Sequence, residues 1–139
     1  MDTEEEKELT QGQGIMNNTN TNNEHPRPGA RVFMTNMGFH DYSAAERWGE
    51  FVPLTQGRVD LVHTDRLEGE IQAKLADFNA SDYLMLGGAP IVVAMCVLYI
   101  MKKFNHVDII YWDAMFSDYR YRRLTGEDRN ERLLAYSGR

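Results

Sequence analysis

Hydrophobic positions divide the chain into a weakly apolar start and a folded remainder. Residues 1–30 contain very few large apolar side chains and combine an acidic run, an Asn/Thr tract and a Pro-rich end. Such a segment cannot bury enough apolar surface to offset the entropy lost on ordering, so we expect it to be disordered. About 110 residues remain, which is enough for one hydrophobic core.

Short apolar runs beside turn residues predict strands. The candidates are Arg31–Asn36, Phe51–Thr55, Gly57–Thr64, Tyr83–Leu86 and Val107–Ala114. Pro53 restricts the second candidate to a sheet edge or a bulge, because proline cannot donate a ladder hydrogen bond. Apolar and polar residues alternate only weakly in Gly57–Thr64, which makes it the least supported strand.

Two helices are predicted between these strands. Ser43 stands three residues before Glu46, the spacing of a capping box, and a short helix follows that ends near Gly49. The second helix covers Asp65–Phe78, with Asp65 as a possible cap and Glu68 at the box position. Its apolar residues recur on one stripe of an amphipathic helix. They are Leu67, Ile71, Leu75 and Phe78.

The uncharged run that begins at Tyr83 is about as long as a membrane span requires. Gly87, Gly88 and Pro90 interrupt it, however, and leave an apolar helix of about eleven residues followed at once by a strand. Strand, turn, helix and strand form a βαβ unit of a soluble domain. The flanking pair Lys102–Lys103 leaves a membrane anchor as the alternative. A helix that is apolar nearly all round needs further cover, so we expect a homo-oligomer, such as a dimer.

The order of elements predicts an α/β fold. We expect a small Rossmann-like three-layer domain over residues 31–116, with a mostly parallel sheet of four to five strands and helices on its faces. Residues 117–139 carry six basic and four acidic side chains and are predicted to form a basic C-terminal strand or tail. The segment YRYRRL within it is typical of an edge strand protected by charge.

Charge and composition exclude several classes of protein. The net charge of −6 offers no broad basic surface for nucleic acid. Cys96 is the only cysteine, so no disulfide forms within one chain, and a reducing cytoplasm fits best. The four histidines are far apart, and neither a metal site nor a cofactor is predicted.

The candidate site follows from the rule that ligands bind outside the carboxyl ends of strands in open α/β sheets. We predict a nucleotide-like or other anionic small molecule there. The predicted ligand-binding residues are Asn36, His40, Asp41, Gly87, Gly88 and Asp113. The turn LGGAP allows close backbone approach and exposes helix N–H groups, although it matches no established phosphate-binding motif and a tight strand-to-helix turn is the simpler explanation of its glycines.

Several roles at these positions stay open. His40, Asp41 and Ser43 are weak catalytic candidates, and the alternative is a loop held by side-chain to backbone bonds, with Ser43 as a helix cap. Asp113 suits either a ribose hydroxyl or a turn. Nearby aromatic side chains could stack on a base, but core packing explains them as well. They are Trp48, Tyr111, Trp112 and Tyr119.

The stretches TNMGFHDYSAAERWGEFVPLT and DYLMLGG…VDIIYWDA resemble small proteins of unknown function encoded by tailed bacteriophages. The resemblance covers roughly residues 31–114 and implies a viral origin and a place in the host cytoplasm or the virion. It carries over no functional residue. The βαβ unit is also similar in topology to Rossmann-like nucleotide-sensing domains of defence systems, although a fold does not fix a function.

These observations favour a binding protein over an enzyme. The first alternative is a virion or interaction protein without a small-molecule ligand, whose tails contact a viral or host partner. The second is a small hydrolase or transferase that uses His40 and Asp41.

Overall fold

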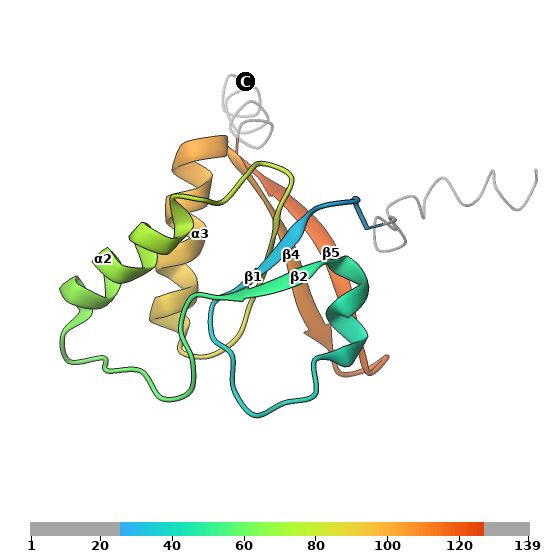
Figure 1. The fold of residues 1–139 in the computed structure, drawn as a ribbon, viewed down its shortest axis with the longest axis horizontal. Coiled ribbons are helices and arrows are strands. Elements are labelled where there is room, and N and C mark those ends of the chain that lie inside the picture. The colour runs from blue at the N-terminus through green and yellow to red at the C-terminus, as the bar shows by residue number, and fades with distance from the viewer. Residues whose placement is uncertain (1–25, 127–139) are drawn as a thin grey trace, which may run out of the picture.

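The computed structural model describes residues 26–126. Disorder is predicted for residues 1–30 and a basic strand or tail for residues 117–139, and the parts of these predictions that fall on residues 1–25 and 127–139 lie outside the described residues. Residues 26–30 are described, and Ala30 is buried. One five-stranded sheet forms the centre of the molecule (Figure 1). Its strands are β1 (Arg31–Met34), β2 (Glu50–Pro53), β3 (Tyr83–Met85), β4 (His106–Asp113) and β5 (Asp118–Thr125).

The strand order is β2-β1-β3-β4-β5. The first four strands are parallel, and β5 pairs with β4 in the antiparallel direction along its whole length. The predicted α/β class with a mostly parallel sheet is thus confirmed. β2 lies at one edge of the sheet, where Pro53 can be accommodated, and β5 forms the other edge.

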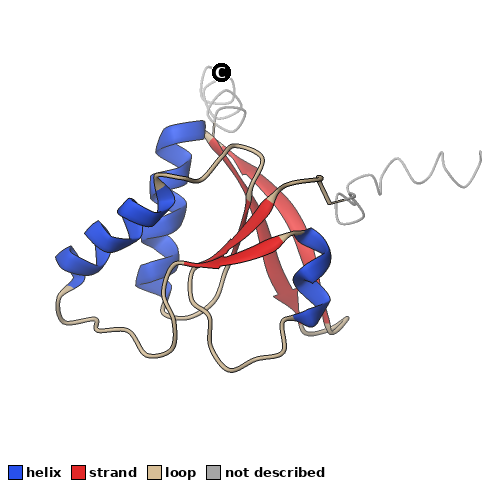
Figure 2. Cartoon of the chain, in the orientation of Figure 1, coloured by secondary structure: helices blue, strands red, loops and turns tan. Residues whose placement is uncertain are grey.

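Helices cover the sheet unequally, as Figure 2 shows. The α-helices α2 (Thr64–Leu75) and α3 (Pro90–Phe104) pack on one face, where Phe33, Leu84 and Ile109 point toward them. The short 3-10 helix η2 (Ser43–Trp48) covers the other face. Alternate strand residues point there and pack around Trp48; they include Val32, Met34, Tyr83 and Ile110.

The apolar run resolves into strand, turn and helix, as the glycines and proline predict. Pro90 is the first residue of α3, and Asn105 ends the helix in the left-handed conformation. α3 has fifteen residues, four more than expected. Within residues 26–126, no helix has both the length and the apolar character to cross a bilayer.

One side of α3 lies against the core, and the opposite side faces solvent. Val92, Cys96 and Ile100 are buried, whereas Ile91 and Leu98 are exposed. That a second copy covers the exposed side stays a prediction.

Two local predictions are wrong. Gly57–Thr64 is a loop up to residue 63, because the Asp60 carboxylate forms its own turn by accepting the Val62 N–H at 2.8 Å and contacting His63 Nδ1 at 2.8 Å. The capping boxes are also absent: α2 begins at Thr64, before Asp65, and neither α2 nor η2 has a side-chain cap.

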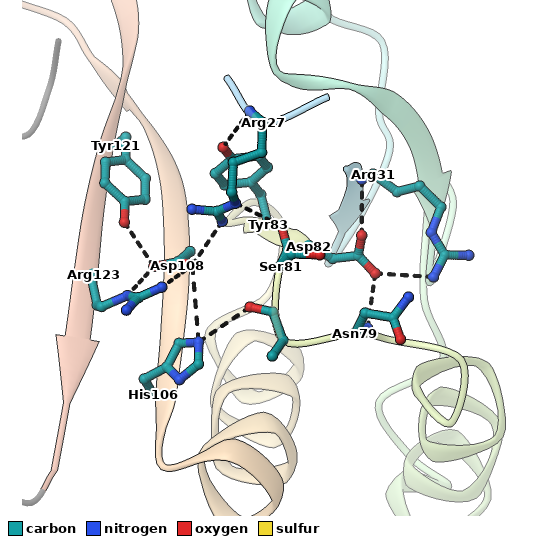
Figure 3. Close-up of polar contacts among 11 residues, drawn as sticks. Arg27, Arg31, Asn79, Ser81, Asp82, Tyr83, His106, Asp108, Tyr121 and Arg123 are labelled. Carbon is teal, nitrogen blue, oxygen red and sulfur yellow. Dashed lines mark hydrogen bonds and ion pairs between the residues drawn. The ribbon is translucent and has the colours of Figure 1, made fainter. Parts of the chain in front are cut away.

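A polar network joins the chain before β1 to β4 and β5 (Figure 3). The Asp108 carboxylate has no exposed surface and accepts from Arg27 Nη2 at 2.8 Å, Arg123 Nε at 2.7 Å and Tyr121 Oη at 2.8 Å. Burial alone would raise the pKa of Asp108, but the bonds from Arg123 and Tyr121 and the two guanidinium charges outweigh it and hold that pKa below its ordinary value. Arg27 thereby anchors the segment before β1 to the folded domain.

A second buried carboxylate supports the start of β1. Asp82 Oδ1 accepts the Arg31 N–H at 2.9 Å, and its Oδ2 accepts the Asn79 N–H at 2.8 Å and Arg31 Nη2 at 3.0 Å (Figure 3). Both networks lie at the amino ends of the parallel strands. The carboxyl ends are left for loops.

Candidate functional site

A pocket of about 550 Å³ opens at the carboxyl ends of β1, β3 and β4. It lies at the switch point of the strand order, because the chain passes from β1 to β2 on one side of β1 and then crosses to β3 on the other side. The lining residues are Asn36, Gly38, His40, Asp41, Tyr42, Met85, Leu86, Gly87, Gly88, Trp112 and Tyr119. Five of the six predicted ligand-binding residues are therefore brought together, and Asp113 is not among them.

Thr35 clamps the floor of the pocket. Its buried hydroxyl accepts the Gly87 N–H at 2.7 Å and donates to the Gly87 carbonyl at 2.5 Å. The Thr35 carbonyl in turn accepts from Thr55 Oγ1 at 2.7 Å. These bonds hold the ends of β1, β2 and β3 together.

Asn36 and Gly88 fit closely against each other. The Asn36 amide donates to Thr55 Oγ1 and to the Gly57 carbonyl, both at 2.9 Å, so this end of the side chain holds the loop after β2. Gly88 has φ +84°, and a Cβ there would lie 2.6 Å from the Asn36 Cβ. Only glycine satisfies both the conformation and the space.

The turn after β3 presents backbone N–H groups at the start of α3. Ala89 is the N-cap and supplies no side-chain hydrogen bond. Among the hydrogen bonds within residues 26–126, none uses the N–H of Gly88. The positive end of the helix dipole therefore lies beside Gly87 and Gly88 in the pocket wall.

The loop between β1 and η2 forms the opposite wall. Asp41 Oδ1 accepts the Ser43 N–H at 3.0 Å, and hydrogen bonds from the Ser43 backbone and side chain lower the pKa of this exposed carboxylate. Tyr42 Oη accepts the Gly38 N–H at 2.9 Å and closes the loop. Asp41 is thus ionised at neutral pH and able to accept a hydroxyl donor.

The three catalytic candidates do not form a nucleophile and base pair. His40 is exposed, and its ring packs edge-on against Tyr42 at 5.9 Å between centroids. Ser43 begins η2 and does not line the pocket. Within the described part of the chain, no hydrogen bond joins His40 to Asp41 or Ser43. These three residues therefore do not form a hydrogen-bonded nucleophile and base within residues 26–126.

Aromatic side chains form the rest of the wall. Trp112 is 49% exposed and meets Tyr119 edge-on at 5.0 Å between centroids. Burial, followed by the charges of Tyr42 and Asp41, raises the pKa of Tyr119, so its hydroxyl stays protonated at neutral pH. From the sequence, Thr35, Tyr42 and Trp112 were expected at the strand ends that could converge on one crevice, although none of them was among the predicted ligand-binding residues. Trp112 and Tyr119 were also expected as possible stacking residues.

Asp113 serves the turn between β4 and β5. Its Oδ1 accepts the Met115 N–H at 3.0 Å, and its Oδ2 pairs with Arg120 Nη1 at 3.2 Å. Of the two roles left open by the sequence, these contacts are those of a turn residue. Across residues 26–126, no three His, Cys, Asp or Glu side chains are grouped closely enough to hold a metal ion.

Comparison with known proteins gives one finding. A family model described as phage Pam3 gp32-like protein matches residues 29–125, which span the entire sheet and the pocket. No curated protein and no solved structure matches the chain. The resemblance to phage-encoded proteins is confirmed, and the match extends beyond the expected residues 31–114 through β5. The chain belongs to the family of phage Pam3 gp32-like proteins.

Proposed function

We propose that the protein binds a nucleotide-like small molecule in the pocket at the carboxyl ends of its strands. The observation that carries this proposal is that one pocket combines an aromatic surface with backbone N–H donors. Trp112 offers an exposed aromatic face, and Gly88 offers a backbone N–H at the positive end of α3. The volume of about 550 Å³ lies within the usual range of small-molecule sites.

The ionised Asp41 carboxylate narrows the ligand class. A simple anion would be repelled by it, whereas a nucleotide carries a base, hydroxyl donors and a phosphate on one molecule. The base would stack on Trp112, a sugar hydroxyl would donate to Asp41, and the phosphate would accept from the turn at Gly88.

The sheet order supports the same ligand class. Strands in the order 2-1-3-4-5 occur in Rossmann-like domains of the flavodoxin type, where a mononucleotide binds at the switch point between the first and third strands. Here the pocket is lined by Asn36 after β1 and Gly88 after β3. We therefore assign the domain to this Rossmann-like class as part of the proposal.

The test is binding of free nucleotides to the purified full-length protein. Thermal-shift and native mass spectrometry would screen adenine, guanine and flavin mononucleotides, with inorganic phosphate alone as the anion control. A ligand at 100 times its Kd should stabilise the fold by about 2.7 kcal/mol. Trp112→Ala should weaken binding about 5- to 150-fold, because base stacking contributes about 1–3 kcal/mol.

Leu98→Ala, on the exposed side of α3, is the matched control and should bind like the unmodified protein. No thermal shift and no retained mass with any nucleotide would refute the proposal. As a phage protein it would act in the host cytoplasm or in the virion. Quantitative mass spectrometry of purified particles would distinguish the two.

A further inference from the structure

Large apolar side chains surround the mouth of the pocket and face solvent. Phe39, between the lining residues Gly38 and His40, is 102% exposed. Met115 and Phe116 form the turn after β4 and are 83% and 63% exposed. We call these residues, together with the half-exposed Trp112, the apolar rim. In Figure 1 the loop after β1 and the turn between β4 and β5 lie at the same end of the sheet.

The apolar area of the rim is at the upper end of the roughly 300–600 Å² found for the largest apolar patch of a typical monomer, which is often functional. At about 150–250 Å² for a fully exposed large side chain, the four residues present on the order of 500–600 Å². Monomeric soluble proteins rarely expose contiguous apolar patches above a few hundred Å². A stable interface buries roughly 800 Å² on each partner, so the rim with its immediate polar border matches one half of a standard interface.

Two ion pairs lie beside the rim, and Asp41 is the carboxylate that lines the pocket itself. Asp113 pairs with Arg120 at 3.2 Å, and Arg47 pairs with Asp118 at 3.3 Å. Neither pair leaves a cluster of one sign, which nucleic acid or an anionic membrane surface would require. These two pairs therefore add no net charge to a contact between two copies of this surface.

The surface combines a protruding side chain with a hollow. The protruding Phe39 stands directly beside the hollow whose wall includes Trp112. A two-fold axis places the same patch of each protomer against the other, so each protrusion can face the other's hollow. We propose that a second copy of this chain docks on the apolar rim and that each Phe39 covers the mouth of the partner's pocket.

This inference does not rest on nucleotide binding, since the rim would be covered whether the pocket is filled or empty. It places the interface at the end of the sheet. The sequence had predicted the outer side of α3 instead. The two surfaces can be separated by mutation, because Leu98 on α3 is 54% exposed and lies outside the pocket lining.

The test is sedimentation velocity of the full-length protein from about 1 to 100 µM. The unmodified protein should dimerise in this range, and Phe39→Asp or Met115→Asp should each raise the dimer Kd about 30-fold or more. Leu98→Asp should leave the Kd unchanged. Circular dichroism would check that each variant is folded. Phe39→Asp should fold normally, because Phe39 is fully exposed and makes no core contact.

Three results would overturn the inference. The first is a monomer at ~100 µM, including one that associates only with another phage or host protein. The second is a dimer that neither rim variant weakens. The third is a dimer that Leu98→Asp dissociates and Phe39→Asp does not, because this would place the interface on α3.

Discussion

Replacing Asp108 with asparagine tests how the domain is held together away from the pocket. The carboxylate is fully buried, and two guanidinium groups and one phenol donate to it. Asparagine keeps the shape but removes the charge and turns one acceptor into a donor that faces Arg27 or Arg123. Removing one partner of a buried ion pair typically costs about 3–5 kcal/mol, because the other charge is left unpaired.

The exposure of the two arginines sets the magnitude within that range. The Arg27 and Arg123 side chains are 31% and 46% exposed, so each freed guanidinium can turn partly to water. We therefore expect Asp108→Asn to lower the free energy of unfolding by about 3 kcal/mol at pH 7. That is a large share of the roughly 5–15 kcal/mol that stabilises an ordinary domain.

Urea unfolding followed by tryptophan fluorescence measures this difference. Asp77→Asn is the matched control, because Asp77 pairs with Arg31 at 2.8 Å but is 79% exposed. An exposed pair contributes about 0–1 kcal/mol. A cost for Asp108→Asn below about 1 kcal/mol, no larger than that of the control, would refute the reasoning.

The pH dependence gives an independent check of the same carboxylate. The folded-state pKa of Asp108 is lowered below the unfolded value of about 3.9. Its contribution is therefore fully present above about pH 4 and is lost as the pH falls through the folded-state pKa. The stability difference between the unmodified protein and Asp108→Asn should be constant from neutral pH to about pH 5 and narrow in stronger acid.

Three further predictions concern the pocket floor and the core. Gly88→Ala should lower the free energy of unfolding by about 2 kcal/mol in thermal unfolding, because the new Cβ would overlap Asn36 and the residue has a positive φ. The control is Gly69→Ala on α2, where the space is open, and it should be neutral or stabilising by up to about 1 kcal/mol. Equal effects of the two substitutions would contradict this prediction. Thr35→Val should cost about 1–3 kcal/mol in urea unfolding, because it leaves both Gly87 backbone groups without their partner; an unchanged midpoint would count against the clamp. Burial raises the pKa of Cys96 to about 12, so a thiol reagent at pH 8 should modify it only after unfolding; labelling of the native protein would show that α3 opens.

The sequence predicted the βαβ unit well because its signals are local and strong. The apolar run is interrupted by Gly87, Gly88 and Pro90, which end the strand and start the helix, so the run cannot be one continuous helix. Asn105 then ends α3 in the left-handed conformation, which asparagine tolerates. The prediction of a strand at Gly57–Thr64 was wrong because its local signal was weak. Weak alternation there competes with an Asp60 side chain that bonds its own backbone neighbours.

The candidate site was predictable only as far as topology allows. Parallel strands end at one edge, so residues that follow β1 and β3 meet there, as Asn36 and Gly88 do. The role of Thr35 depends on which strands are neighbours, which no local pattern reveals. Asp113 was expected at the site because it ends β4, a parallel strand. However, β5 pairs antiparallel with β4 and supplies Arg120, which forms an ion pair with the Asp113 carboxylate within the turn.

The two ends of the sheet carry different kinds of polar group, and this division bears on where function lies. At the amino ends, Asp82 and Asp108 are buried and surrounded by donors within 3.0 Å, so little capacity is left for a ligand. At the carboxyl ends, Asp41 and the Gly88 N–H are exposed, and aromatic surface faces solvent beside them. Groups that satisfy each other stabilise a fold, whereas groups left facing an open hollow retain the capacity to bind. The family match over residues 29–125 includes both ends of the sheet, so the pocket and most of the buried networks lie within the same family domain.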